Sequence, residues 1–198
     1  MKKFLHVGCG MKRKDQTTGG FNSEAWEEIR LDIDPAVSPD VVGSMTSMSA
    51  VPSGSVDAIF SSHNIEHLYA HEVPVALQEF LRVLSSDGFA VITCPDLKSV
   101  AALVADDKLL DTAYVSAAGP ITPLDMLYGH RGAMARGNLF MAHHCGFTIK
   151  VLMQTMKQAG FGSVGGKARP KSFDLWAVGS KVPRSDEELG KLAQAHFP

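Results

Sequence analysis

The chain has 198 residues, of which 45% are hydrophobic and 20% are charged, and its formal net charge is −2. This composition is that of a globular protein with one well-filled core, and it excludes an intrinsically disordered chain. The near-neutral charge and the absence of any long run of Lys or Arg argue against a nucleic-acid-binding surface.

No apolar run approaches the length of a membrane span, so we expect no membrane partner. Residues 1–4 lead directly into an expected strand and not into the apolar core of a signal peptide, which favours a cytoplasmic protein. Cys9, Cys94 and Cys145 contain no CxxC pair, so neither a disulfide framework nor a zinc ribbon is indicated.

Strand-like and helix-like segments alternate through the first half of the chain, which predicts parallel βαβ units. Four short strands are expected at residues 4–7, 29–33, 40–43 and 56–61. An amphipathic helix follows over residues 65–84, and Pro74 within it is expected to divide it into two helices. A turn at residues 85–88 then precedes a fifth strand at 89–93.

The second half of the chain begins with a helix from 97 to about 105. Residues 98–147 are rich in Gly, Pro and Met and are too short for a separate core, so we expect a lid or insertion. A helix is expected up to residue 159, with Thr148 as its N-cap and Gly160 just past its end. Two strands near 163–168 and 173–178 are expected to be joined by a hairpin connection.

These elements together predict an α/β fold with a Rossmann-like, doubly wound, mostly parallel sheet and a C-terminal antiparallel hairpin. Residues 1–183 are expected to form one domain, with residues 184–198 as a charged tail that holds a marginal helix.

Two signals at the ends of the expected strands indicate a nucleotide-like ligand. Gly8 and Gly10 directly follow the first strand, where glycines let the backbone approach a ligand closely. Asp32 ends the second strand, where a carboxylate can accept hydrogen bonds from both hydroxyls of a ribose. Asp34, next to Pro35, is equally well explained as a turn residue.

Both signals also occur in nicotinamide-dependent enzymes. The dinucleotide-binding fingerprint, however, requires a third glycine at the position that Arg13 occupies. Residues 14–25 are mostly polar, so the helix after the first strand is expected to be short or missing. These features disfavour an NAD-dependent dehydrogenase.

Five segments, taken in chain order, resemble the class I S-adenosylmethionine (SAM) dependent methyltransferases, in particular the methyltransferase 11-like group. They are Phe4–Gly10, Leu31–Asp34, Ser55–His63, Ile65–Leu68 and Glu79–Gly88. The match covers roughly residues 4–95, and Gly160-Phe161 resembles a recurrent family feature that precedes the final hairpin. The resemblance implies the class I methyltransferase fold and SAM as the methyl donor.

The resemblance also implies where the donor would bind. The expected donor-binding residues are Gly8, Cys9, Gly10, Asp32, Ile33, Ser44, Met45 and His63. Asp32 would hold the ribose hydroxyls. Family members often have an aspartate after the third strand for the adenine amino group. Here the aligned residues are Gly43-Ser44-Met45, so Ser44 or a backbone group would take that role.

An acceptor that must lose a proton needs a general base. The candidate catalytic residues are His63, His143 and His144, and Glu66 and His67 are further candidates for the base. Together with His130, the pair His143-His144 invites a metal hypothesis. Adjacent histidines rarely face one ion, and no carboxylate is spaced to join them, so we expect no metal.

We therefore expect methyl transfer to a small-molecule or glycan-type acceptor that the sequence does not identify. Residues 61–64 lack the Asn/Asp-Pro-Pro-aromatic tetrapeptide of nucleobase amino methylation, which argues against a DNA substrate. The alternatives are a non-catalytic SAM-binding or interaction domain and, less favoured, an NAD-dependent dehydrogenase. The sequence does not define the oligomeric state.

Overall fold

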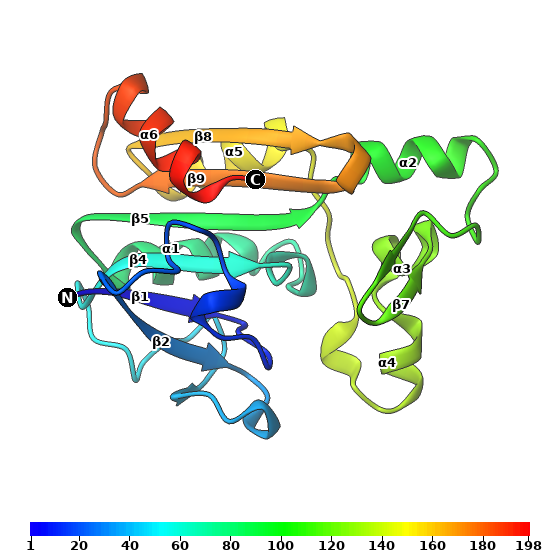
Figure 1. The fold of residues 1–198 in the computed structure, drawn as a ribbon, viewed down its shortest axis with the longest axis horizontal. Helices are drawn as coiled ribbons and strands as arrows, with labels where there is room; N and C mark the ends of the chain where they lie inside the picture. Colours follow the sequence, from blue (N-terminus) through cyan, green and yellow to red (C-terminus); the bar gives the residue numbers. More distant parts are fainter.

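The computed structural model describes residues 1–198 and contains a seven-stranded sheet in the order β3-β2-β1-β4-β5-β9-β8 (Figure 1). The parallel strands are β1 (Lys2–Val7), β2 (Trp26–Asp32), β3 (Val41–Val42), β4 (Val56–Ser62) and β5 (Leu84–Pro95). The antiparallel pair is β8 (Ser163–Arg169) and β9 (Asp174–Ser180). The predicted mostly parallel sheet with a C-terminal hairpin is confirmed.

One face of the sheet is covered by α1 (Val73–Val83) and α5 (Ile149–Ala159), which enclose the main core of 26 buried residues. The expected division of the 65–84 segment is confirmed, because a 3-10 turn at Ile65–His67 precedes α1. Pro74 lies in the first turn of α1, where its missing N–H is tolerated. Thr148 caps α5 as predicted, and Gly160 ends it in the left-handed conformation.

The opposite face has no α-helix between β1 and β2, as the sequence predicted; only a 3-10 turn, Lys14–Gln16, lies there. The helix α6 (Asp186–His196) lies over this face (Figure 1). It packs there against an aromatic cluster centred on Phe21. The rings of Phe21 and His196 lie 4.2 Å apart, and Thr18 Oγ1 bonds His196 Nδ1 at 2.7 Å. The C-terminal segment is therefore part of the core packing.

Residues 85–88, expected as a turn, lie within β5. The pairing of β4 and β5 is interrupted there, because Val56 pairs with Leu84 whereas Ala58 pairs with Phe89. The extra residues form a bulge in β5. Glycine is needed at position 88 because a side chain there would be crowded: its Cβ atom would lie 3.2 Å from the carbonyl oxygen of Asp57. The prediction of a separate turn is wrong at this position.

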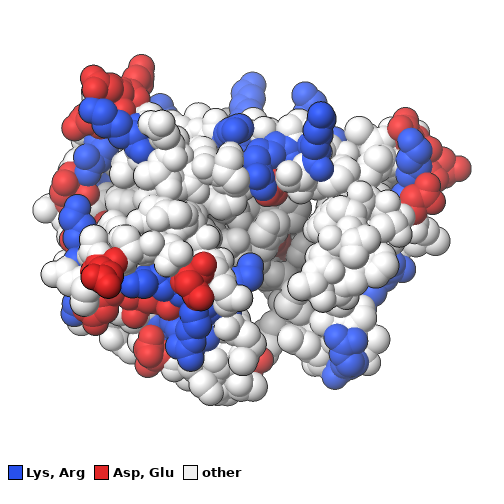
Figure 2. All heavy atoms as spheres, in the orientation of Figure 1, with Lys and Arg blue, Asp and Glu red and all other residues white.

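Residues beyond β5 begin with α2 (Leu97–Ala105) at its predicted position. They continue through the hairpin of β6 (Tyr114–Ser116) and β7 (Gly119–Ile121), then α3 (Pro123–Tyr128) and α4 (Arg131–Ala135). This part lies beyond the carboxyl ends of the parallel strands, and the molecular surface is hollowed between the two parts (Figures 1 and 2). No helix has the length and apolar character that a membrane span requires.

Candidate active site

A cavity of about 570 Å³, here called the donor cavity, lies at the carboxyl ends of the parallel strands. Its walls come from the loops after β1, β2, β3 and β4 and from residues 138–141. It is lined by every residue that the resemblance implied for donor binding: Gly8, Cys9, Gly10, Asp32, Ile33, Ser44, Met45 and His63. The structure thus brings together side chains from four separate loops.

Gly8 and Gly10 have different structural roles. Both have a positive φ, +62° at Gly8 and +52° at Gly10. A Cβ atom on Gly8 would lie 2.0 Å from Asn64 Oδ1, whereas a Cβ atom on Gly10 would meet nothing within 4 Å. Asn64 Nδ2 donates to the carbonyls of Val7 at 2.9 Å and Ser62 at 3.0 Å, so it ties the ends of β1 and β4 together. Gly8 makes room for that tie, and Gly10 leaves the cavity open.

Asp32 is buried, and its carboxylate holds the backbone of two loops. Oδ2 accepts the N–H of Gly10 at 2.8 Å, and Oδ1 accepts the N–H of Asp34 at 2.9 Å. A carboxylate oxygen has two acceptor positions, so each oxygen retains one for a further donor. The carboxylate is therefore held in place and can still accept two hydroxyl groups from a ligand.

Arg30, which was not predicted as a site residue, binds the backbone of the same loops through its side chain. Its buried guanidinium donates to the carbonyls of Gly10 at 2.5 Å, Ser38 at 2.7 Å, and Lys12 and Val37 at 3.3 Å each. A buried cation needs such a set of acceptors to offset its lost hydration. The signal in the sequence is a charged residue within an expected buried strand, two residues before Asp32.

The donor cavity also has an exposed apolar wall. Ile33 follows β2, and Leu139 and Phe140 belong to a 3-10 turn, Leu139–Met141; all three side chains are exposed and line the cavity. Exposed apolar side chains around a concave site suit an aromatic or aliphatic ligand group. Several lining residues were not predicted, including His6, Met11, Lys12, Asn64 and residues 138–141.

A smaller cavity of about 190 Å³ adjoins the donor cavity; it is called the acceptor cavity here after the methyl acceptor that the resemblance predicts. Its lining includes Leu97 and Val100 of α2, Tyr128 of α3, and the segment His143–Gly146. His144 lines both cavities, so they meet at this residue. His144 also stacks on Tyr69, with ring centroids 4.2 Å apart.

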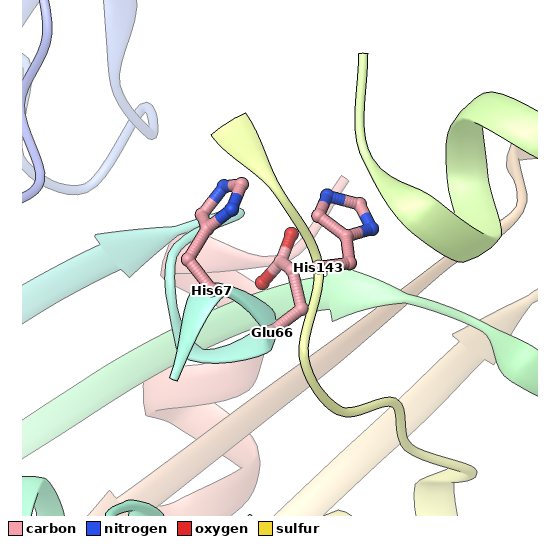
Figure 3. A group of neighbouring side chains, drawn as sticks. All are labelled: Glu66, His67 and His143. Atoms are coloured by element: carbon pink, nitrogen blue, oxygen red, sulfur yellow. The ribbon is translucent and has the colours of Figure 1, made fainter. Parts of the chain in front are cut away.

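A polar cluster lies between the two cavities. Glu66 is 1% exposed, and neither of its carboxylate oxygens has a hydrogen-bond partner. His67 and His143 lie on either side of it (Figure 3), and His63 Nδ1 lies 3.4 Å from Glu66 Oε1. Burial raises the pKa of the Glu66 carboxyl, but His63, His67 and His143 together outweigh burial and hold the pKa below its usual value. Burial also lowers the pKa of His143.

The candidate catalytic histidines are thus divided between the cavities. His63 lines the donor cavity, His143 lines the acceptor cavity, and His144 lines both. His130 instead caps α4, where its Nδ1 accepts the N–H of Ala133 at 3.1 Å. Arg131, which follows His130, is paired with Asp125 at 2.7 Å and lines neither cavity.

The strand order, the glycine loop after β1 and the acidic residue at the end of β2 define a Rossmann-like fold of the class I methyltransferase type. Residues 5–92 match the family model of the methyltransferase domain. The resemblance to the class I SAM-dependent methyltransferases described above is thus confirmed over residues 5–92. No curated protein sequence matches the chain significantly.

Solved structures with the same fold are distant in sequence. A SAM-dependent methyltransferase from Thermotoga maritima has a TM-score of 0.57 and 13% identity, over 91% of this chain and 83% of that chain. The 1,6-didemethyltoxoflavin-N1-methyltransferase of Burkholderia thailandensis, solved with 1,6-didemethyltoxoflavin and S-adenosylhomocysteine, has a TM-score of 0.56 and 14% identity, over 91% and 71%. A methyltransferase in complex with the Trm112 activator of Haloferax volcanii has a TM-score of 0.58 and 13% identity, over 92% and 83%.

Proposed function

We propose that this methyltransferase binds SAM in the donor cavity and transfers its methyl group to a small-molecule or glycan-type acceptor in the acceptor cavity. The observation that carries the proposal is the position of the two cavities, which meet at His144. A methyl group moves directly between donor and acceptor, so their sites must adjoin.

The residues of the donor cavity fit SAM. The volume of about 570 Å³ is typical of a cofactor site. Each oxygen of Asp32 has an acceptor position left for a ribose hydroxyl. Ile33 and Met45 offer apolar contacts to the adenine ring. Ser44 Oγ already accepts the N–H of Thr46 at 3.2 Å and forms a hydrogen bond with the Thr46 hydroxyl at 2.8 Å. Because Ser44 is engaged in this way, a backbone group is favoured as the partner of the adenine amino group.

SAM supplies a methyl group on a sulfonium, which is already a good leaving group. The protein therefore contributes mainly by holding the acceptor in line and excluding water, and such placement can lower a barrier by ~7–11 kcal/mol. An acceptor that must lose a proton needs a base nearby. His144 is the best-placed candidate because it is exposed to both cavities; His63 and His143 each reach one of them.

The acceptor cavity limits what can react. A volume of about 190 Å³ accommodates a single ring or a terminal group, with the rest of a larger molecule outside. Its walls combine apolar side chains, such as Val100 and Met126, with the histidine segment. The relative from Burkholderia thailandensis acts on a small ring compound, which supports the same class of acceptor here.

Calorimetric titration of the folded protein with SAM, S-adenosylhomocysteine and NAD tests the donor. We expect binding of the first two but not of NAD. Asp32→Ala should weaken SAM binding at least tenfold, since charge-assisted hydrogen bonds contribute ~1.5–3 kcal/mol. Asp34→Ala is the matched control: it removes a carboxylate from the same cavity edge and should change affinity less than threefold. Absence of heat with both SAM and S-adenosylhomocysteine would refute the proposal.

A further inference from the structure

Glu66, His67 and His143 form a group of potential metal ligands that the mechanism above does not require. One ring nitrogen of each histidine and one oxygen of Glu66 all lie within 4.8 Å of one another. Bonds of about 2.0–2.2 Å to zinc put neighbouring ligand atoms about 3–4 Å apart, so the three side chains need to converge by only about 1 Å. Figure 3 shows the carboxylate between the two rings.

The buried carboxylate itself indicates a missing partner. Glu66 is 1% exposed, and neither of its oxygens makes a hydrogen bond, although His63 Nδ1 lies 3.4 Å from Oε1. An ionised carboxylate in this position is costly unless a cation compensates for its lost hydration. Protonated His67 and His143 can supply that compensation, and a divalent ion between Glu66 and the two neutral rings would supply it in their place.

The surroundings of the histidines match those of metal ligands. His67 Nδ1 lies 3.0 Å from the carbonyl oxygen of Ala142, and His143 Nδ1 lies 2.9 Å from that of Met126. A carbonyl oxygen can only accept, so each Nδ1 must carry the proton. In the neutral ring Nε2 then has a free lone pair, and a backbone carbonyl on the other nitrogen is the usual support of a metal-bound histidine.

The backbone holds these elements against each other. The carbonyl of Glu66 accepts the N–H of His144 at 2.9 Å and the N–H of Cys145 at 3.2 Å. The 3-10 turn that carries Glu66 and His67 is thereby fixed to the segment that carries His143. Contacts between residues far apart in the sequence bring the cluster together. For this reason the spacing of residues along the chain did not predict that a carboxylate would join the histidines.

We propose that Glu66, His67 and His143 bind one divalent transition-metal ion, of which Zn²⁺ is the model, between the donor and acceptor cavities. Two imidazoles and one carboxylate are a ligand set that leaves coordination positions open. Glu66 and His143 line the acceptor cavity and His67 lines the donor cavity, so the open positions face the reaction space.

The role of this ion rests on the proposed function. An acceptor with a hydroxyl or carboxylate oxygen would bind at an open position, which lowers the pKa of a bound hydroxyl. The hydroxyl proton would pass to His144 or to water. The acceptor oxygen would then form its bond to the methyl carbon as the carbon–sulfur bond breaks and its electron pair stays on sulfur. The site therefore predicts an oxygen-bearing acceptor.

Metal binding is tested without SAM or acceptor, on untagged, chelator-treated protein. Titration with Co²⁺, followed by visible absorption, and calorimetry with Zn²⁺ should each give one equivalent bound. Glu66→Gln keeps the side-chain shape and should weaken binding at least tenfold, and His143→Asn, at a half-buried position, should do the same. His71→Asn, an exposed histidine outside the cluster, is the matched control and should bind as the wild type does. Thermal melts establish that each variant is folded.

Two results would overturn the site: no saturable one-to-one binding by the wild-type protein, or unchanged affinity in a folded Glu66→Gln or His143→Asn variant. The two proposals fail separately. A protein that binds SAM but neither metal overturns the metal site alone. A protein that binds one equivalent of Co²⁺ but no SAM overturns the proposed function and leaves the metal site in place.

Discussion

Substitution of Gly8 by alanine should destabilise the protein strongly, because two separate costs arise at this residue. A side chain at φ +62° occupies the left-handed region, which costs an L-residue about 1–2 kcal/mol. The new Cβ would also lie 2.0 Å from Asn64 Oδ1, so Asn64 must leave and give up its bonds to Val7 and Ser62. Each of those bonds contributes about 0.5–1.5 kcal/mol, which brings the expected loss to about 2–5 kcal/mol.

Equilibrium unfolding in urea measures this loss, and Gly10→Ala is its control. Gly10 also has a positive φ, +52°, but a Cβ atom there meets no heavy atom within 4 Å. The control should lose only about 1–2 kcal/mol of stability, while its methyl group should weaken SAM binding. In a protein that already carries Asn64→Ala, Gly8→Ala should lower the free energy of unfolding by less than it does in the wild type, because the clash with Asn64 is absent. Equal destabilisation by the two glycine substitutions would refute the assigned role of Asn64.

Two further predictions concern buried polar residues. Arg30→Met should lower the free energy of unfolding by about 3 kcal/mol and weaken SAM binding, because four loop carbonyls lose their donor. Urea unfolding measures the loss of stability, and calorimetry measures the SAM affinity. An unchanged SAM affinity would contradict the role of Arg30 in holding these loops. Burial lowers the pKa of His196 from 6.5 to about 4. The unfolded chain then binds the proton first as pH falls, so stability should drop by up to about 3 kcal/mol between pH 6.5 and pH 4. His196→Phe keeps a ring on Phe21 and should flatten this part of the pH profile; a profile that is as steep as that of the wild type would exclude His196 as its source.

The sheet could be predicted from the sequence because its signals are local. Each parallel strand is a short apolar run with turn residues beside it, and the Pro74 break and the Thr148 cap act within one helical turn. The bulge in β5 could not be predicted, because residues 85–88 have the composition of a turn. Long-range contacts keep them in the strand: Leu84 pairs with Val56, and the carbonyl of Gly88 accepts the N–H of Lys181 at 2.9 Å.

The donor cavity could be predicted because its residues follow consecutive strands, whose carboxyl ends meet at one edge of the sheet. Asn64, Arg30 and Phe140 were missed because their roles depend on contacts across the fold. The same holds for the proximity of Glu66 to His143, which lie on a turn after β4 and on a segment before α5. Spacing along the chain carries no signal for such a pair.

The position of α6 has a consequence for how the chain folds. The bond between Thr18 and His196 joins residues 178 positions apart, and the aromatic face around Phe21 and Trp26 is closed only when α6 docks. That face therefore stays incompletely covered until residues 186–196 have been synthesised and have folded onto it. Contacts of such long range form late in folding. Until α6 docks, this aromatic cluster is open to the aggregation that transiently exposed hydrophobic surface promotes.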